Sequence, residues 1–270
     1  MDNVQPLVDL AWATPLLRTQ SRLPELRDQV AVSADWSESS ACAMSENSWF
    51  VLESGQGDYA FNMALDEALL ESMPRLGKPV LRFYAWKQKA ASFGYFQRFA
   101  EVEKMTLLRP LVRRPTAGGL VPHDADWTYS VTFPNTHEWY SLSATESYCR
   151  VHEWIQRAFA SLEVRTELAA SCRKSEAGQC FSGWEKFDVV WKGRKVAGAA
   201  QRRKREGLLI QGSVQPPPLS IGREMWERAM RERAEHELEW VEFKLDQELN
   251  QRVLELTEKK YSREEYYRKR

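Results

Sequence analysis

Two short segments carry residue types that could handle an acyl group. Residues 113–124 hold two arginines, a glycine pair and His123. Glycine lets the backbone approach a ligand closely, and N–H groups freed by such a turn can bind an anion or a carbonyl oxygen. Residues 193–202 place Lys195 ahead of a run of small residues. Small residues weaken strand packing unless something approaches the backbone, so a ligand is expected beside this lysine.

Neither segment fits a general nucleotide-binding motif. The P-loop requires Gly-x4-Gly-Lys-Ser/Thr, and the dinucleotide fingerprint requires Gly-x-Gly-x-x-Gly before a helix. Gly118 and Gly119 are equally compatible with a tight turn between two strands. The glycine pair therefore indicates a ligand site only together with the residues around it.

Cys180 is the candidate nucleophile because residues 178–183 have the composition of a loop. The thiolate is the reactive form of cysteine, and a nearby ammonium lowers the pKa of a thiol. Lys195 could supply that ammonium if the fold brings the two residues together. Two plainer alternatives stay open, since most cysteines are small buried side chains and a lysine beside a turn is usually solvated.

Other charged residues have more modest interpretations. His123 and Asp124 are adjacent, but chance pairs are common, so we predict a structural or ligand-positioning histidine rather than a general base. Asp66 and Glu67 must diverge on a helix and cannot both face one substrate. The basic run at residues 202–205 is typical of a solvated turn, and contact with an acidic partner protein is the alternative.

Composition indicates a globular protein and excludes several classes. The 270 residues are 43% hydrophobic, and 38 basic residues balance 38 acidic ones. No net charge attracts nucleic acid or an anionic membrane, and no apolar run reaches the roughly 20 residues that cross a bilayer. Four cysteines without a Cys-x-x-Cys pair favour neither a zinc site nor a disulfide framework. We expect a cytoplasmic protein without a bound metal.

Periodicity predicts strands and helices in irregular alternation, which favours an α+β fold with a mixed or antiparallel sheet. Residues 1–47 lack periodicity and are predicted to be a loose extension, within which Met44 is an alternative start. Pro74 is expected to end the first helix, and a capping box at Ser143 is expected to begin the second. Strands are predicted at residues 49–52, 80–86, 90–94, 126–133, 187–191, 195–201 and 208–214, the last three as an antiparallel meander; helices are predicted at residues 60–73, 223–236 and 241–260, the last two as an amphipathic cap.

Five ordered motifs resemble the lipoate-protein ligase and octanoyltransferase family, which shares its catalytic domain with biotin protein ligases. They are residues 62–69, 81–86, 92–97, 113–124 and 193–202. The resemblance implies a catalytic domain at residues 48–215 with mixed or antiparallel sheets flanked by helices, followed by a C-terminal helical segment at residues 216–270. Ala117 departs from the family, which usually has a further glycine at this position.

Within that family, the chain looks most like the cysteine-dependent octanoyltransferases. In these enzymes a thiol takes an acyl chain from acyl carrier protein with the help of a lysine, and Cys180 and Lys195 match those two positions. The resemblance implies transfer onto a lysine of a lipoyl domain of 2-oxoacid dehydrogenases or of the glycine-cleavage H protein, without a cofactor. The expected substrate-binding residues are Arg82, Arg114, Thr116, Gly118, Gly119, His123, Gly198 and Ala199.

Two alternatives remain at this stage. An ATP-dependent lipoate-protein ligase would form an acyl-adenylate with ATP and Mg, but Cys180 would then have no chemical role. Only about 55 residues follow Val214, which leaves little room for the accessory domain that such ligases often carry. A non-catalytic acyl- or carrier-binding module is the second alternative. The length of the acyl chain stays open, as does the choice between an acyl tunnel and plain core for the side chains Arg82, Tyr84, Trp86 and Phe93.

Overall fold

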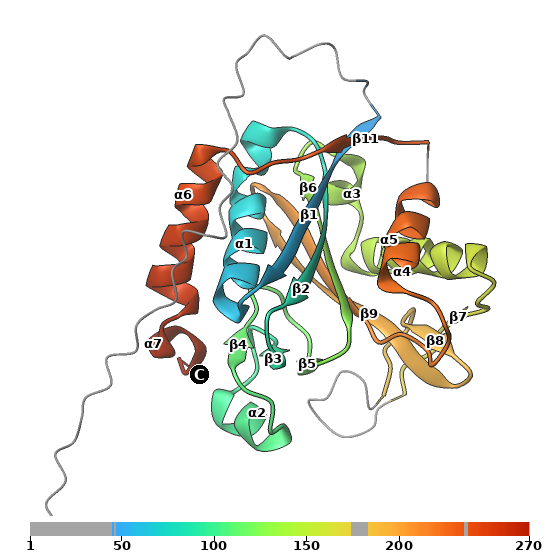
Figure 1. The fold of residues 1–270 in the computed structure, drawn as a ribbon, viewed down its shortest axis with the longest axis horizontal. Coiled ribbons are helices and arrows are strands. Elements are labelled where there is room, and N and C mark those ends of the chain that lie inside the picture. The colour runs from blue at the N-terminus through green and yellow to red at the C-terminus, as the bar shows by residue number, and fades with distance from the viewer. Residues whose placement is uncertain (1–44, 46, 174–182, 235–236, 270) are drawn as a thin grey trace, which may run out of the picture. The chain divides into compact units, whose positions relative to one another are not determined.

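The computed structural model describes residue 45 and residues 47–173, 183–234 and 237–269 (Figure 1). Cys180 lies outside the described residues, and so does almost all of the predicted extension at residues 1–47. The roles predicted for these residues therefore rest on the sequence alone.

An eight-stranded mixed sheet forms the centre of the fold, with strand order β11-β1-β2-β6-β10-β9-β8-β7 (Figure 1). Strand β1 pairs in parallel with β11 and β2, and all later neighbours pair antiparallel. The predicted meander is confirmed as β8, β9 and β10. The strands are β1 (Ser48–Gly57), β2 (Val80–Trp86), β6 (Trp127–Pro134), β7 (Glu167–Leu168), β8 (Val189–Trp191), β9 (Arg194–Lys204), β10 (Gly207–Val214) and β11 (Glu239–Glu242).

A second, three-stranded sheet carries the arginine- and glycine-containing segment. In it β3 (Ala90–Phe93) pairs in parallel with β4 (Leu111–Arg113) and antiparallel with β5 (Val121–His123). The glycine pair lies in the connection between β4 and β5. Helix α2 (Phe99–Met105) packs against this sheet through Phe99 and Val102.

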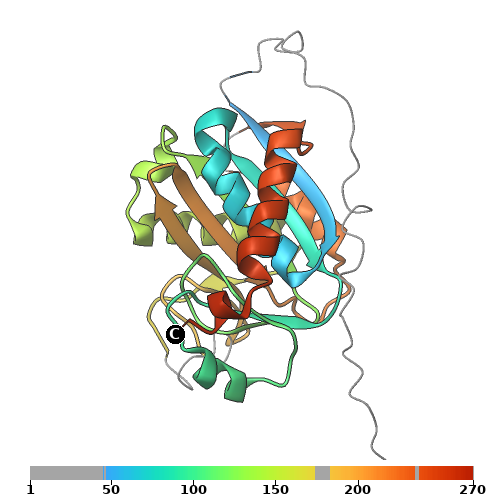
Figure 2. The same cartoon turned by 90° about the vertical axis from the view of Figure 1, so that its left-hand side faces the viewer.

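Helices cover both faces of the large sheet. Helices α1 (Tyr59–Leu76) and α6 (Gln247–Leu256) lie side by side on one face, and Figure 2 shows α6 in red beside α1 in cyan. Helices α4 (Ala144–Ser161) and α5 (Arg223–Glu232) cover the other face, and the short α3 (Glu138–Ser141) precedes α4. Strand side chains alternate between the two hydrophobic cores, as the period of a strand requires.

Apolar and polar residues alternate at 126–133, which predicts a half-buried strand, whereas all eight residues of β6 are buried. Tyr129, Val131 and Phe133 face the core beneath α4 and α5. The polar alternates are covered as well, and the Ser130 hydroxyl donates to Asp66 of α1 at 2.7 Å. The polar side chains of β6 thus lie beneath α1 and do not face solvent.

Two predicted chain breaks are wrong. Helix α1 continues past Pro74 to Leu76, because this proline removes an N–H only near the helix end. Gly77 then ends the helix in the left-handed region, with its N–H bonded to the Met73 carbonyl. The two glycines Gly55 and Gly57, close together after the predicted strand at 49–52, predict a turn, but both belong to β1, where a register shift accommodates a positive φ at Gly55.

The C-terminal segment, expected to be helical, also contributes strand β11 to the large sheet. Its four residues are too few, and too heavily flanked by charge, to show a period in the sequence. After α6 the chain makes a π-helical turn (Thr257–Tyr261) and ends in α7 (Glu264–Tyr267). Lys260 and Tyr261 bind the buried Glu67 carboxylate at 2.5 and 2.7 Å, which ties this end of the chain to α1.

These contacts confirm the prediction that the adjacent residues Asp66 and Glu67 point in different directions on their helix. Glu67 faces the C-terminal segment and Lys204, whereas Asp66 faces Arg82 of β2. The two carboxylates therefore serve separate networks. The capping box is also confirmed, since Ser143 and Glu146 exchange both expected hydrogen bonds at the start of α4.

Candidate active site

A cavity of about 40 Å³, open to solvent, lies between the small sheet and strands β9 and β10. Most of its lining is apolar or small, with a few polar groups. The lining residues are Met63, Tyr84, Trp86, Ser92, Arg114, Gly118, Val121, His123, Thr128, Lys195, Gly198, Ala199, Ala200, Gln211, Gly212 and Ser213.

The structure brings two distant sequence segments together at this cavity. Among the predicted site residues, Arg114, Gly118 and His123 reach it from the first segment, and Lys195, Gly198 and Ala199 from the second. The aromatic side chains Tyr84 and Trp86 line it too. The predicted residues outside the lining are Arg82, Thr116 and Gly119; Phe93 belongs to the core of the small sheet.

The glycine loop is held in place by Arg114. Its guanidinium donates to the carbonyls of Ala117 and Gly119 at 3.0 and 2.8 Å and to the Ser92 hydroxyl at 2.8 Å. Gly118 has a φ of +88°, which a residue with a side chain rarely adopts. A Cβ on Gly94 would lie 1.9 Å from the Gly118 carbonyl oxygen, so the two backbones approach closely. Glycine at both positions shapes the loop.

The neighbouring arginine has a different role. Arg113 is fully buried and donates to the carbonyls of Tyr95 and Gln97 at 2.7 and 2.8 Å. It also donates to the Tyr267 carbonyl of α7 at 2.8 Å. Arg113 therefore joins the loop after β3 to the C-terminal helix, while Arg114 faces the cavity.

His123 lies in a hydrogen-bonded wall of the cavity and stacks on Trp86, with ring centroids 3.9 Å apart. Its Nδ1 lies 2.8 Å from Asp126 Oδ2 and its Nε2 lies 2.6 Å from Ser92 Oγ. The sequence neighbour Asp124 is exposed, so the histidine's carboxylate partner is Asp126. Substrate contact by His123 stays a prediction, and the paired ring is suited to positioning.

Lys195 is a buried residue of β9 rather than a solvated lysine. Its side chain is 6% exposed, and Nζ lies 2.7 Å from Oδ2 of the fully buried Asp188. A Cβ on Gly198 would lie 2.6 Å from Lys195 Nζ and 3.1 Å from Asp188 Oδ1. The small residue at position 198 thus gives the lysine itself room beside the cavity, and the ligand expected beside it stays a prediction.

Gly198→Ala is expected to displace the Lys195 ammonium and to lower the acyl transfer expected from the sequence by about 10²-fold, the cost of roughly 1 Å of misplacement. Initial rates of acyl transfer would measure this. Gly222→Ala is the matched control, because a Cβ there meets nothing within 4 Å and φ is negative. Equal rates for both variants would contradict the proposed tight fit around Lys195.

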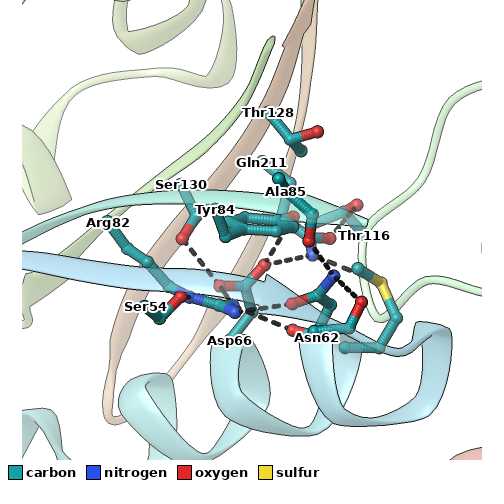
Figure 3. A network of polar contacts seen from close by, with 12 residues as sticks. Ser54, Asn62, Asp66, Arg82, Tyr84, Ala85, Thr116, Thr128, Ser130 and Gln211 are labelled. Atoms are coloured by element: carbon teal, nitrogen blue, oxygen red, sulfur yellow. Dashed lines mark hydrogen bonds and ion pairs between the residues drawn. The ribbon is translucent and has the colours of Figure 1, made fainter. Parts of the chain in front are cut away.

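Arg82 is fully buried within a network of polar contacts between β2 and α1 (Figure 3). Its guanidinium binds Asp66 at 2.7 Å, the Asn62 carbonyl and side-chain oxygens at 2.9 Å each, and Ser54 at 2.8 Å. It also lies over the ring of Tyr84, with Cζ 3.9 Å from the centroid. Arg82 therefore packs against Tyr84, which lines the cavity, and does not line the cavity itself.

Gln211 is a cavity residue that the sequence reasoning missed. Its amide donates to Asp66 Oδ2 at 2.7 Å and accepts from the Thr116 hydroxyl at 2.7 Å (Figure 3). Thr116 thus acts on the cavity through Gln211. A signal was present, because a glutamine interrupts the apolar run of β10. Ser92, Thr128 and Ser213 were missed as well, since isolated hydroxyl residues in strands give no pattern.

His152 of α4 is a buried histidine close to the Lys195 side of the site. Its Nδ1 donates to the Tyr148 carbonyl at 2.8 Å, and its Nε2 has no hydrogen-bond partner within the described part of the chain. Burial lowers the pKa of His152 to about 4. The folded protein thus favours the neutral ring, whereas the unfolded chain takes up a proton near pH 6.5.

This shift predicts acid destabilisation. Above about pH 6.5, His152 is neutral in both the folded and the unfolded state and does not lower the free energy of unfolding. As the pH falls from 6.5 to 4, only the unfolded chain takes up the proton, and the free energy of unfolding falls by about 3 kcal/mol. Denaturant unfolding across that range measures the loss, and His152→Phe should flatten the dependence on pH. Parallel pH profiles for the two proteins would show that His152 is not the cause.

Comparisons with known proteins agree with this geometry. Residues 58–215 match the family model of the lipoyl protein ligase A/B catalytic domain. The chain belongs to this family. Octanoyltransferase LipM from Bacillus subtilis (strain 168) is 38% identical over 187 residues, which cover 63% of this chain and 66% of the relative. The matched part is thus just under two thirds of that relative's length.

Solved structures of the family share the fold. A lipoate-protein ligase A bound with ATP has a TM-score of 0.67 at 20% identity, covering 82% of this chain and 98% of that chain. The bi-partite lipoate protein ligase of Thermoplasma acidophilum, studied with its E2 lipoyl domain, has a TM-score of 0.61 at 20% identity, with coverages of 82% and 96%. The predicted α+β ligase-like fold is confirmed.

The described residues include neither a membrane-spanning helix nor a metal-binding cluster. No helix there combines the length and the apolar character needed to cross a membrane. The same residues contain no group of three or more His, Cys, Asp or Glu side chains that could hold a metal ion.

Proposed function

We propose that this protein is an octanoyltransferase that moves an octanoyl group from acyl carrier protein, through a thioester at Cys180, to a lysine of an acceptor protein. The observation that carries the proposal is the buried Lys195 beside a largely apolar cavity, 15 residues after a cysteine in a loop-like segment. The similarity to LipM supports the same activity. The proposed setting is protein lipoylation in the cytoplasm.

The first half-reaction would load the enzyme. The Cys180 thiolate attacks the thioester carbonyl of the donor, and the new carbon–sulfur bond replaces the bond to the carrier's sulfur. Backbone N–H groups of the glycine loop meet the negative charge that develops on the carbonyl oxygen. The Lys195 ammonium, paired with Asp188, stabilises the attacking thiolate, and the departing carrier thiolate takes up a proton from water. The octanoyl chain occupies the apolar part of the cavity.

The second half-reaction would discharge the enzyme. The acceptor's amine attacks the Cys180 thioester, an amide bond forms, and the thiolate leaves. The amine loses its proton to water, so the site regains its starting charge with Lys195 still an ammonium. No group beyond Cys180, Lys195 and the two substrates is needed, and the proposed reaction therefore uses no cofactor.

A lipoyl domain of 2-oxoacid dehydrogenases, or the glycine-cleavage H protein, is the proposed acceptor. The fold neighbour from Thermoplasma acidophilum is paired with an E2 lipoyl domain, which supports an acceptor of this kind for the shared fold. Acyl carrier protein is the proposed donor because the reaction requires an activated octanoyl thioester.

Dependence on ATP tests the proposal. The purified protein is incubated with octanoyl-acyl carrier protein and a lipoyl domain without ATP, and in parallel with free octanoate, ATP and Mg²⁺. Transfer in the first reaction, measured as one octanoyl mass increment on the lipoyl domain, is the expected result. Modification only in the second reaction would assign an ATP-dependent ligase, and modification in neither would assign a non-catalytic binding module.

A further inference from the structure

A series of buried polar groups leads from Lys195 away from the cavity to helix α4. Lys195 forms its ion pair with Asp188, which lies just before β8. The Tyr148 hydroxyl of α4 donates to the other oxygen of the same carboxylate. One helical turn later, His152 packs against the Tyr148 ring with centroids 4.2 Å apart.

The Asp188 carboxylate is held from three sides. Oδ2 accepts from the Glu185 backbone N–H and pairs with Lys195 Nζ, both at 2.7 Å, and Oδ1 accepts from Tyr148. Asp188 has no exposed surface. A buried carboxylate with fixed donors forms a rigid counter-ion, and the loss of one partner of such a pair leaves an uncompensated charge.

Tyr148 joins this carboxylate to helix α4. Burial, together with the charge of Asp188, raises the pKa of Tyr148 well above its usual value. The hydroxyl therefore remains a hydrogen-bond donor at neutral pH. One side chain of helix α4 thus contacts the carboxylate that pairs with Lys195.

The titratable groups that face Asp188 come from three elements in the described part of the chain. They are Lys195 of β9, Tyr148 and His152 of α4, and Tyr129 of β6. Burial lowers the pKa of His152 to about 4 and raises that of Tyr129, so both rings are neutral near pH 7. The local charge on Asp188 is therefore matched by Lys195.

We propose that Asp188 and Tyr148 are positioning residues that hold the Lys195 ammonium charged and fixed beside the cavity. The role of Lys195 in acyl transfer rests on the function proposed above, whereas the positioning itself is a property of the fold. Asp188 supplies the counter-charge, and Tyr148 fixes the orientation of that carboxylate through its hydrogen bond to Oδ1. Neither residue contacts the reacting atoms in this scheme.

Kinetics of two conservative variants test the role in transfer. Asp188→Asn is expected to lower kcat by at least about 10²-fold and to move the basic limb of the kcat–pH profile down by about one unit, because a neutral amide no longer favours the ammonium. Tyr148→Phe is expected to lower kcat about tenfold with little change in KM for the acceptor, and Asp188→Glu to restore part of the rate. Tyr140→Phe, from the neighbouring α3, is the matched control and should behave as wild type.

Labelling of Lys195 tests the positioning without any acyl transfer. Competitive reductive methylation, followed by peptide mass spectrometry, gives the pH at which Lys195 is half-labelled. Asp188→Asn is expected to lower that pH by at least about one unit. If wild type transferred no octanoyl group, the proposed function would fail, and this labelling would still decide the positioning.

Unchanged results would overturn the inference. Identical half-labelling pH values and kcat–pH profiles for wild type and Asp188→Asn would show that the carboxylate does not control the ammonium. If Asp188→Asn does not fold, as judged by far-UV circular dichroism, Tyr148→Phe decides alone. A Tyr148→Phe kcat equal to that of Tyr140→Phe would then refute the proposal.

Discussion

Cys180→Ala is expected to lower ATP-independent octanoyl transfer by at least about 10³-fold. Loss of the nucleophile removes the covalent route entirely, and what remains is the small acceleration from binding the two substrates together. Initial rates with octanoyl-acyl carrier protein and a lipoyl domain measure the effect. Cys180→Ser should also be nearly inactive, because a hydroxyl near a lysine ionises far less readily than a thiol.

Two other cysteines provide matched controls. Cys149 lies half-buried on α4, where burial and Glu153 raise the pKa of its thiol, and Cys172 is exposed. Cys149→Ala and Cys172→Ala are expected to keep transfer within about twofold of wild type. If Cys180→Ala kept the same activity as these two variants, the covalent mechanism would be excluded.

Arg82→Met is expected to destabilise the protein by about 3–5 kcal/mol, because it leaves the Asp66 carboxylate buried without its counter-ion. Both side chains of this ion pair have no exposed surface. Denaturant unfolding gives the free-energy change. Some activity is lost as well, since Arg82 supports Tyr84 in the cavity wall.

The control for this prediction is an ion pair at the surface. Arg75 pairs with Asp246 at 2.5 Å, but its side chain is 40% exposed. Arg75→Met should therefore cost less than about 1 kcal/mol, as solvent screens such pairs. Equal costs for Arg75→Met and Arg82→Met would show that the buried network contributes little to stability.

Much of the fold could be predicted from local patterns in the sequence. The capping box at Ser143 and the meander after residue 187 depend on neighbouring residues, and both are confirmed. Pro74 was misjudged because its cost depends on where the helix ends, which Gly77 decides. Strand β11 depends on pairing with β1 almost 200 residues away, and no local period records such a contact.

In the candidate site, too, local patterns could be predicted from the sequence, and contacts between distant residues could not. Gly198 and Lys195 stand out because small residues surround a lysine within one strand. Asp188, by contrast, becomes the partner of Lys195 only through pairing of β8 with β9 and cover from α4. Arg82 has the residue type of a ligand-binding side chain, and only the fold shows that Asp66 and Asn62 occupy its donors.

Intact mass spectrometry after incubation with octanoyl-acyl carrier protein alone tests the central claim most directly. We expect one octanoyl increment on wild type, sensitive to hydroxylamine and located at Cys180 by peptide mapping, with no increment on Cys180→Ala. An increment of equal yield on both proteins, or none on a wild-type enzyme that still modifies the lipoyl domain, would contradict a thioester intermediate at Cys180.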